Sequence, residues 1–74
     1  MEGQMARNNT YKMVEIVGTS NESFARAVAS GVSRASKSLR NLDWFEVIEM
    51  RGKITNGKVA QYQVKMKVGF RLED

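Results

Sequence analysis

The sequence predicts one small α+β domain whose elements follow the order strand, helix, strand, strand. Three observations carry this prediction: a β-branched segment near the N-terminus, one long helical pattern, and a clearly alternating segment near the C-terminus. A chain of 74 residues has room for a single domain. It contains no cysteine and no histidine, which excludes disulfides, zinc and iron–sulfur centres, thiol nucleophiles and histidine-based triads. We therefore expect no metal site and no catalytic residues.

The N-terminal part divides into a tail and a strand. Residues 1–9 are polar and lack any period, so we expect a disordered tail followed by a single domain over residues 10–74. Met5 is an alternative start to the first methionine. Residues 11–20 predict a strand, because they are rich in β-branched residues and end just past Gly18.

A helix is expected next. Thr19 or Ser20 can cap it, and Thr19 with Glu22 fits a capping box. Small or apolar residues then recur with helical spacing over about 21 residues, or roughly 30 Å. They are Phe24, Ala27, Val28, Gly31, Val32, Ala35, Leu39 and Leu42. Glycine costs a helix about 1 kcal/mol relative to alanine, so we attribute Gly31 to a close approach of helix and sheet.

The C-terminal half predicts a β-hairpin. Residues 44–55 are strand-like, and Asn56-Gly57 is a strong signal for a two-residue turn. Residues 52–59 also have the spacing of a phosphate-binding loop. However, Val59 stands where that loop has a Ser or Thr, and a strand follows in place of a helix, so we favour the hairpin. Beyond the turn, alternation predicts a strand with one buried and one polar face. The apolar positions are Ala60, Tyr62, Val64, Met66, Val68, Phe70 and Leu72.

The lengths of these elements bear on assembly. A straight strand from Lys58 to Leu72 would measure about 50 Å, whereas a compact domain of this size has a radius of gyration of about 11 Å. The hairpin must therefore curl around the helix or project past it onto a neighbour. The first two strands carry apolar residues on both faces, and one helix covers only one face of a sheet. We therefore predict an obligate oligomer.

The charge suits an anionic partner, such as a phosphate, a nucleotide or a nucleic acid. Twelve Lys and Arg face eight Asp and Glu, for a net charge of +4. The last strand predicts a polar and basic stripe of Gln61, Gln63, Lys65, Lys67 and Arg71. Tyr62 and Phe70 fall on its opposite face, so the stripe is expected to lack the aromatic platform of a sheet that binds RNA. Glu46 and Glu49 differ in parity and are expected to face opposite sides.

Four segments resemble the dodecins, small flavin-binding proteins of bacteria and archaea. They are YKMVEIVGTS, SRASKSLRNLDWFEV, RGKITNGKV and YQVKMKVGFRLED, which cover residues 11–74 in order and without an evident gap. The resemblance implies a three-stranded antiparallel sheet wrapped around one helix, and assembly of these units into a hollow homododecamer. Such an assembly would account for the surplus apolar surface and the long hairpin.

The resemblance also implies where ligands bind. Dodecins hold flavins in pairs at subunit contacts, stacked between tryptophans of symmetry-related chains, and the matching residue is Trp44. Composition alone favours a plug at one end of the core for this single tryptophan. The other residues that match the family's flavin pocket are Gln63, Arg51, Arg71, Phe45 and Glu46.

The residue types suit these implied roles. Indole and isoalloxazine are both large planar π systems, and stacking adds to the gain from burying apolar area. Gln63 carries an acceptor and a donor side by side, which match the pyrimidine edge of a flavin. Arg51 and Arg71 are permanently charged forks suited to an FMN phosphate or to ion pairs that shape the pocket. The sequence does not divide these two roles between them.

The function implied by the resemblance is storage, buffering and photoprotection of flavin. We expect FMN, with riboflavin or FAD as alternatives. We expect no enzyme, because paired stacking removes the room that a flavoenzyme needs beside its ring. Some bacterial dodecins also bind coenzyme A, for which Arg34, Lys37 and Arg40 offer positive charge without an assigned site.

Two other classes of function stay open. One is a nucleic-acid-binding module that uses the basic sheet face, and the other is a flavin-dependent oxidoreductase. The apolar runs are too short to span a bilayer and no signal peptide opens the chain, so we expect a cytoplasmic protein without membrane contacts.

Overall fold

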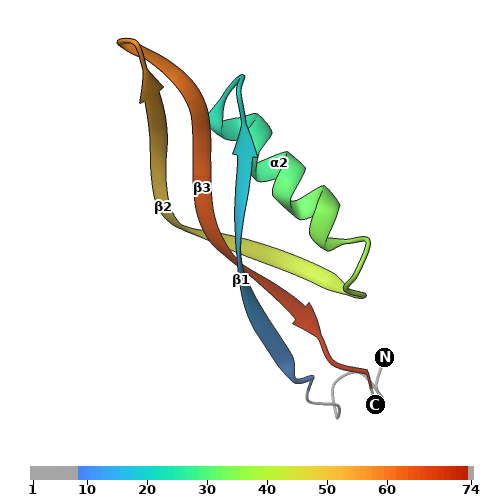
Figure 1. Ribbon diagram of the computed structural model, residues 1–74. Helices are drawn as coiled ribbons and strands as arrows, with labels where there is room; N and C mark the ends of the chain where they lie inside the picture. Colours follow the sequence, from blue (N-terminus) through green and yellow to red (C-terminus); the bar gives the residue numbers. More distant parts are fainter. Residues whose placement is uncertain (1–8, 74) are drawn as a thin grey trace.

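The computed structural model describes residues 9–73, which form a three-stranded sheet and one helix. The elements are β1 (Tyr11–Ser20), α2 (Phe24–Ala35), β2 (Leu42–Thr55) and β3 (Lys58–Arg71). The strands are antiparallel in the order β1-β3-β2, so the last strand is central. The predicted β-α-β-β order and antiparallel sheet are confirmed (Figure 1). The expected N-terminal tail lies, apart from Asn9, outside the described residues.

The helix begins one turn later than the capping-box pattern predicts. Ser23, and not Thr19 or Ser20, is the N-cap, and its hydroxyl accepts a hydrogen bond from the backbone N–H of Arg26 at 3.0 Å. The Ser20 hydroxyl instead accepts from the backbone N–H of Glu22 at 2.9 Å, which closes the turn between β1 and α2. Ser20 therefore closes the turn and Ser23 caps the helix, although both residues are of a type that favours the N-cap.

The helix is also shorter than its apolar spacing predicts, because it ends at Ala35 after 12 residues. The serines that follow compete for backbone hydrogen bonds, as when the Ser36 hydroxyl donates to the Ser33 carbonyl at 2.7 Å. Asn41 then takes a positive φ of 63°, which turns the chain into β2. Among residues 9–73, no helix is long and apolar enough to cross a membrane.

The core lies between α2 and the inner face of β3. Its buried side chains are Ala27, Val64, Met66 and Val68. Of the seven positions predicted to be buried, Val64, Met66 and Val68 are buried in a single chain, whereas Ala60 and Leu72 at the two ends are exposed. The close approach expected at Gly31 is present: a Cβ there would lie 2.7 Å from the Met66 methyl carbon and 3.1 Å from the Gly18 Cα.

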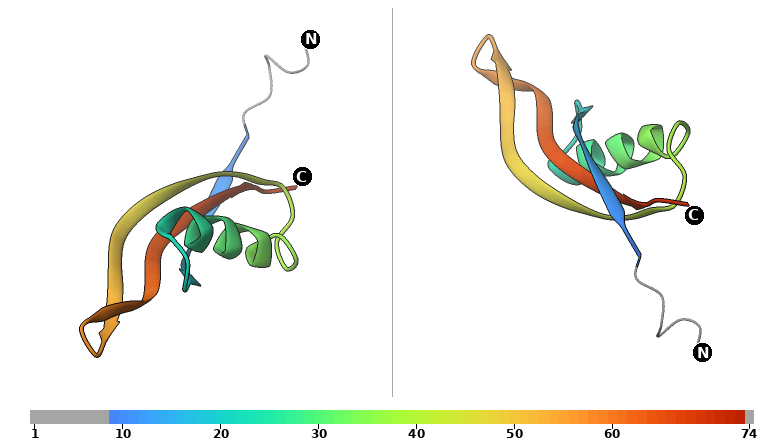
Figure 2. Two further views of the ribbon diagram at one scale, coloured as in Figure 1. Left: turned by 90° about the horizontal axis from the view of Figure 1, so that it is seen from above. Right: turned by 90° about the horizontal axis from the view of Figure 1, so that it is seen from below.

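The molecule is elongated. Its radius of gyration is 15.8 Å, larger than the roughly 11 Å of a compact domain of this length, and its extents are 58 × 20 × 17 Å. The hairpin of β2 and β3 curves and projects past the helix (Figure 2). This matches the second of the two predicted alternatives, projection past the helix.

The β2 strand is left without cover in a single chain. None of its residues is buried, and Ile54 at the projecting end is 72% exposed. Other exposed large apolar side chains include Phe45, Val47, Ile48, Met50 and Val59. Monomeric proteins rarely expose so much contiguous apolar surface, so this surface is consistent with an oligomer.

We expect the two glycines at the helix–sheet contact, Gly18 and Gly31, to differ in how well they tolerate substitution by alanine. A Cβ on Gly18 would overlap the backbone carbonyl of Ala27, which cannot move without shifting the helix. We expect Gly18→Ala to destabilise by about 1–3 kcal/mol through overpacking. Gly31→Ala meets the flexible end of Met66 and, at 3.1 Å, the Gly18 Cα, but it gains about 1 kcal/mol of helix propensity, so it should cost less than Gly18→Ala. Urea unfolding at matched chain concentrations measures both, and equal losses would contradict this account.

Candidate functional site

The face of the sheet that points away from α2, here called the outer face, carries most of the predicted site residues. Cross-strand partners project to the same side of a sheet. The relevant pairs are Trp44 with Gly69, Glu46 with Lys67, Glu49 with Lys65 and Arg51 with Gln63. Since these β3 residues alternate with the buried ones, Trp44, Glu46, Arg51 and Gln63 share the outer face, as does Arg71 by the same parity.

Phe45 is the exception among the predicted residues. It pairs with Val68, so it lies on the helix face of the sheet. There it lines a hollow of about 130 Å³ together with Val32, Leu42 and Trp44. By register Phe45 and Trp44 face opposite sides of the sheet, although both residues line this hollow.

Two register shifts in β2 decide which side chains reach the outer face. Leu42 pairs with Phe70 and Trp44 pairs with Gly69, so Asp43 is an extra residue in β2. A second shift lies between Val47 and Glu49. Such bulges reverse the parity of all later residues in the strand.

The second shift corrects one prediction. Glu46 and Glu49 were expected on opposite faces, but both lie on the outer face, opposite Lys67 and Lys65. The parity argument assumed a regular strand, and the bulge adds one residue between them. Glu49 forms an ion pair with Arg51 at 3.4 Å.

Trp44 is partly exposed, at 36%, and is held by three contacts. Its indole N–H donates to a Glu46 carboxylate oxygen at 3.3 Å. The Tyr11 ring lies with its centroid 5.2 Å away and its plane inclined by 64°. Gly69 lies beneath the six-membered ring, since a Cβ there would fall 2.6 Å from Cζ2 and Cη2. The core is on the other face of the sheet, so this placement argues against a core plug.

These rings also correct the expectation for the basic stripe. The stripe was expected to lack an aromatic neighbour, because the aromatic residues of β3 face inward. Trp44 from β2 and Tyr11 from β1 supply aromatic rings on the outer face. The prediction considered only the aromatic residues of β3, because the sequence of β3 does not show which residues of the neighbouring strands lie beside it.

A second group of polar residues lies further along the outer face. The Arg51 Nε donates to the side-chain oxygen Oε1 of Gln63 at 2.7 Å. The Gln63 amide in turn donates to the Gln61 side-chain oxygen at 2.8 Å. Gln61 was predicted only as part of the stripe, although its place two residues before Gln63 on the same face was a sufficient signal.

Within one chain, Trp44 and Gln63 are well separated. Gly69, the partner of Trp44, is six positions from Gln63 on β3, which corresponds to about 20 Å of strand. Arg71 lies two positions beyond Gly69, on the Trp44 side. The predicted residues therefore form a tryptophan half with Glu46 and Arg71, and a glutamine half with Arg51.

Comparison with known proteins identifies the family. The family model described as Dodecin matches residues 10–73. The chain belongs to the dodecin family. It is 55% identical over 64 residues to the dodecin of Thermus thermophilus, which covers 86% of this chain and 93% of that relative. It is 31% identical over 64 residues to the calcium dodecin of Mycobacterium tuberculosis, covering 86% and 90%.

A solved structure supports the same conclusion. Dodecin from Streptomyces davaonensis has a TM-score of 0.90 and 53% identity to this chain, and the match covers 92% of this chain and 100% of that one. The resemblance predicted from the sequence is therefore confirmed. Its consequence is that the chain is a member of a family of small binding proteins that form homo-oligomers.

Positive charge in this dodecin-family chain is partly balanced on the outer face. The Lys65 ammonium pairs with Glu15 at 3.8 Å, and Lys67 lies in register between Glu15 and Glu46. Because a nucleic acid needs uncompensated charge, this balance weakens the case for a nucleic-acid-binding sheet. The residues considered for coenzyme A belong elsewhere, to the end of α2 and the loop after it, where Arg40 pairs with Glu73 at 3.8 Å.

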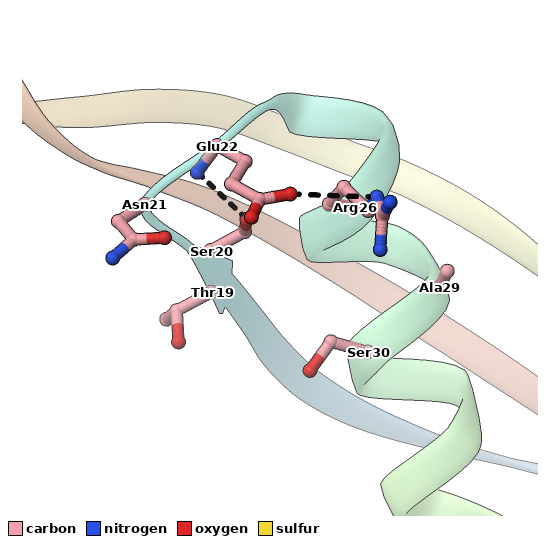
Figure 3. Close-up of a pocket in the computed structure, with 7 residues that line it drawn as sticks. All are labelled: Thr19, Ser20, Asn21, Glu22, Arg26, Ala29 and Ser30. Carbon is pink, nitrogen blue, oxygen red and sulfur yellow. Dashed lines mark hydrogen bonds and ion pairs between the residues drawn. The ribbon is translucent and has the colours of Figure 1, made fainter.

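A separate polar hollow of about 400 Å³ lies between the end of β1 and the start of α2 (Figure 3). It contains the exposed ion pair of Glu22 with Arg26, at 3.5 Å. None of the predicted site residues lines it. Within residues 9–73, no group of three His, Cys, Asp or Glu side chains is placed to hold a metal ion.

Proposed function

We propose that this chain binds flavin, with FMN expected ahead of riboflavin or FAD, and that Trp44 is the stacking platform. The observation that carries the proposal is the position of the indole, partly exposed on the outer face with one side against Gly69. A planar aromatic ligand on the open side would bury both π systems. Membership of the dodecin family supports this assignment.

The site forms between chains in this proposal. A flavin ring system is shorter than the roughly 20 Å of strand that separates Trp44 from Gln63 in one chain. The tryptophan half of one subunit therefore meets the glutamine half of another. The Arg51 guanidinium is already engaged by Gln63 and Glu49, so it shapes the pocket. Arg71, on the tryptophan half, is the arginine assigned to the FMN phosphate.

Storage, buffering and photoprotection fit this arrangement better than catalysis. A flavin between an indole and a second flavin offers no open face to a substrate. Close stacking on an oxidisable indole also favours electron transfer to the excited flavin, which would quench it. We propose a cytoplasmic, non-enzymatic homododecamer for this purpose, with coenzyme A as a further ligand whose site stays unassigned.

A spectrum of the protein as purified tests the proposal directly. Bound, stacked flavin makes the protein yellow but non-fluorescent, and mass spectrometry names the flavin. A flavin-dependent oxidoreductase would instead turn over NADH. A colourless protein that does not take up added FMN would overturn the proposal.

The assembly is expected to contain about twelve chains, because one helix covers only one face of the sheet and closed symmetric assembly covers the rest. Multi-angle light scattering on micromolar protein measures the mass. A monomer would exclude the proposed site, since no chain completes it alone, and a dimer would contradict the proposed dodecamer.

Trp44→Ala is expected to remove most of the flavin affinity while helix content and assembly mass stay unchanged. Aromatic stacking contributes about 1–3 kcal/mol per ring, and two symmetry-related indoles serve each flavin pair. Fluorescence titration measures the loss. Trp44→Phe is the matched variant, because it keeps much of the ring but is a far poorer electron donor. A Phe variant that quenches bound flavin as fully as the parent would contradict the photoprotective role.

Gln63→Ala is expected to weaken flavin binding by about 1–3 kcal/mol, the cost of leaving a buried polar edge without its partner. The assembly should persist, since Gln63 lies on the outer face and outside the core. Mixed assemblies refolded from Gln63→Ala and Trp44→Ala chains test the shared site. Pockets that take Trp44 from the first chain and Gln63 from the second are intact, so part of the affinity returns. No recovery would place both residues in one chain's site.

A further inference from the structure

The position of the Trp44 ring depends on the residue beneath it. A Cβ built on Gly69 would lie 2.6 Å from Cη2 and Cζ2 of the indole and 2.7 Å from Cε2. Near-equal distances to three adjacent ring atoms place that Cβ over the face of the six-membered ring, not beside its edge. Carbon atoms in contact sit about 3.5–4 Å apart, so a methyl group here would push the indole away by about 1 Å.

Tyr11 supports the same ring from the other edge strand. Its ring centroid lies 5.2 Å from that of the indole and its plane is inclined by 64°, so the two rings meet edge to face and do not stack in parallel. The indole N–H, held by Glu46, fixes the remaining rotation about the side chain. Contacts from β1, β2 and β3 therefore hold the indole, with Gly69 against one of its faces.

The register shift at Asp43 brings these partners together. Leu42 pairs with Phe70, so an unbroken register would pair Asp43 with Gly69 and Trp44 with Val68. Trp44 would then point toward the helix, because Val68 is a core residue. The extra residue rotates Trp44 to the outer face and sets it directly opposite the one glycine of the outer row of β3.

We infer that Gly69 and Tyr11 are positioning residues for the Trp44 platform: the bare backbone of Gly69 seats one face of the indole, and Tyr11 braces it, so that the other face is presented to an aromatic ligand. This inference rests on the proposed flavin site for its functional meaning. The seating itself is a property of the chain without ligand. Because the Trp44 ring is already held in place, it does not have to become ordered when a planar ligand binds.

Gly69→Ala tests the seating. Trp44 is the single tryptophan, so near-ultraviolet circular dichroism and acrylamide quenching of selectively excited emission both report on its environment. We expect a smaller dichroism signal and stronger quenching in Gly69→Ala, with unchanged assembly mass. Gly52→Ala is the matched control, because it adds the same methyl group to the same sheet with no indole within 4 Å. Equal signals in Gly69→Ala and the parent would overturn the inference, whatever flavin does.

The FMN affinity of Gly69→Ala separates the two proposals. We expect it to fall by about tenfold or more, on the scale of overpacking costs. A displaced indole with unchanged FMN affinity would support the seating and overturn Trp44 as the platform. If Gly69→Ala fails to assemble, Tyr11→Ala and Tyr11→Phe decide. Loss of the optical signal in the Ala variant alone supports the inference, whereas an unchanged signal in both variants overturns it.

Discussion

The pairing of β2 with β3 is the constraint on which the site depends. β3 is the central strand, and it alternates between a core under α2 and the polar outer face. Any residue of β2 therefore takes its environment from its partner on β3. The two shifts at Asp43 and before Glu49 change that partner, and with it the face, for every residue that follows. The bulges, more than the strand pattern, bring Trp44, Glu46 and Arg51 to one surface.

This dependence explains which features the sequence predicts. The alternation of β3 and the Asn56-Gly57 turn depend on local pattern, and both appear as expected in the structure. Helical spacing likewise predicted α2, but the apolar residues Leu39 and Leu42 continue the spacing after the helix has ended. Leu39 belongs to the loop after the helix and Leu42 to β2, and apolar spacing alone does not show that the helix has already ended.

The candidate site was predicted with similar limits. Resemblance to the dodecins named Trp44, Gln63 and the two arginines, because those motifs survive in the sequence. The resemblance did not predict that Phe45 faces the helix side of the sheet, or that Gly69 lies under the indole. Those relations link residues far apart in the chain through a bulge, and a single sequence carries no clear signal for a bulge. The division into a tryptophan half and a glutamine half is likewise a matter of distance along β3.

The hydrogen bonds around Gln63 have a consequence for recognition. Arginine has no acceptor, so the side-chain oxygen of Gln63 must face Arg51 and its nitrogen must face Gln61. Reversing the amide would break both bonds, so donor and acceptor stand in a fixed order. A ligand edge that meets this amide must then present its own donor and acceptor in the complementary order. A nearly flat ligand with a single donor–acceptor pair on its edge would match this order in only one of its two flipped orientations, a choice that shape alone would leave open.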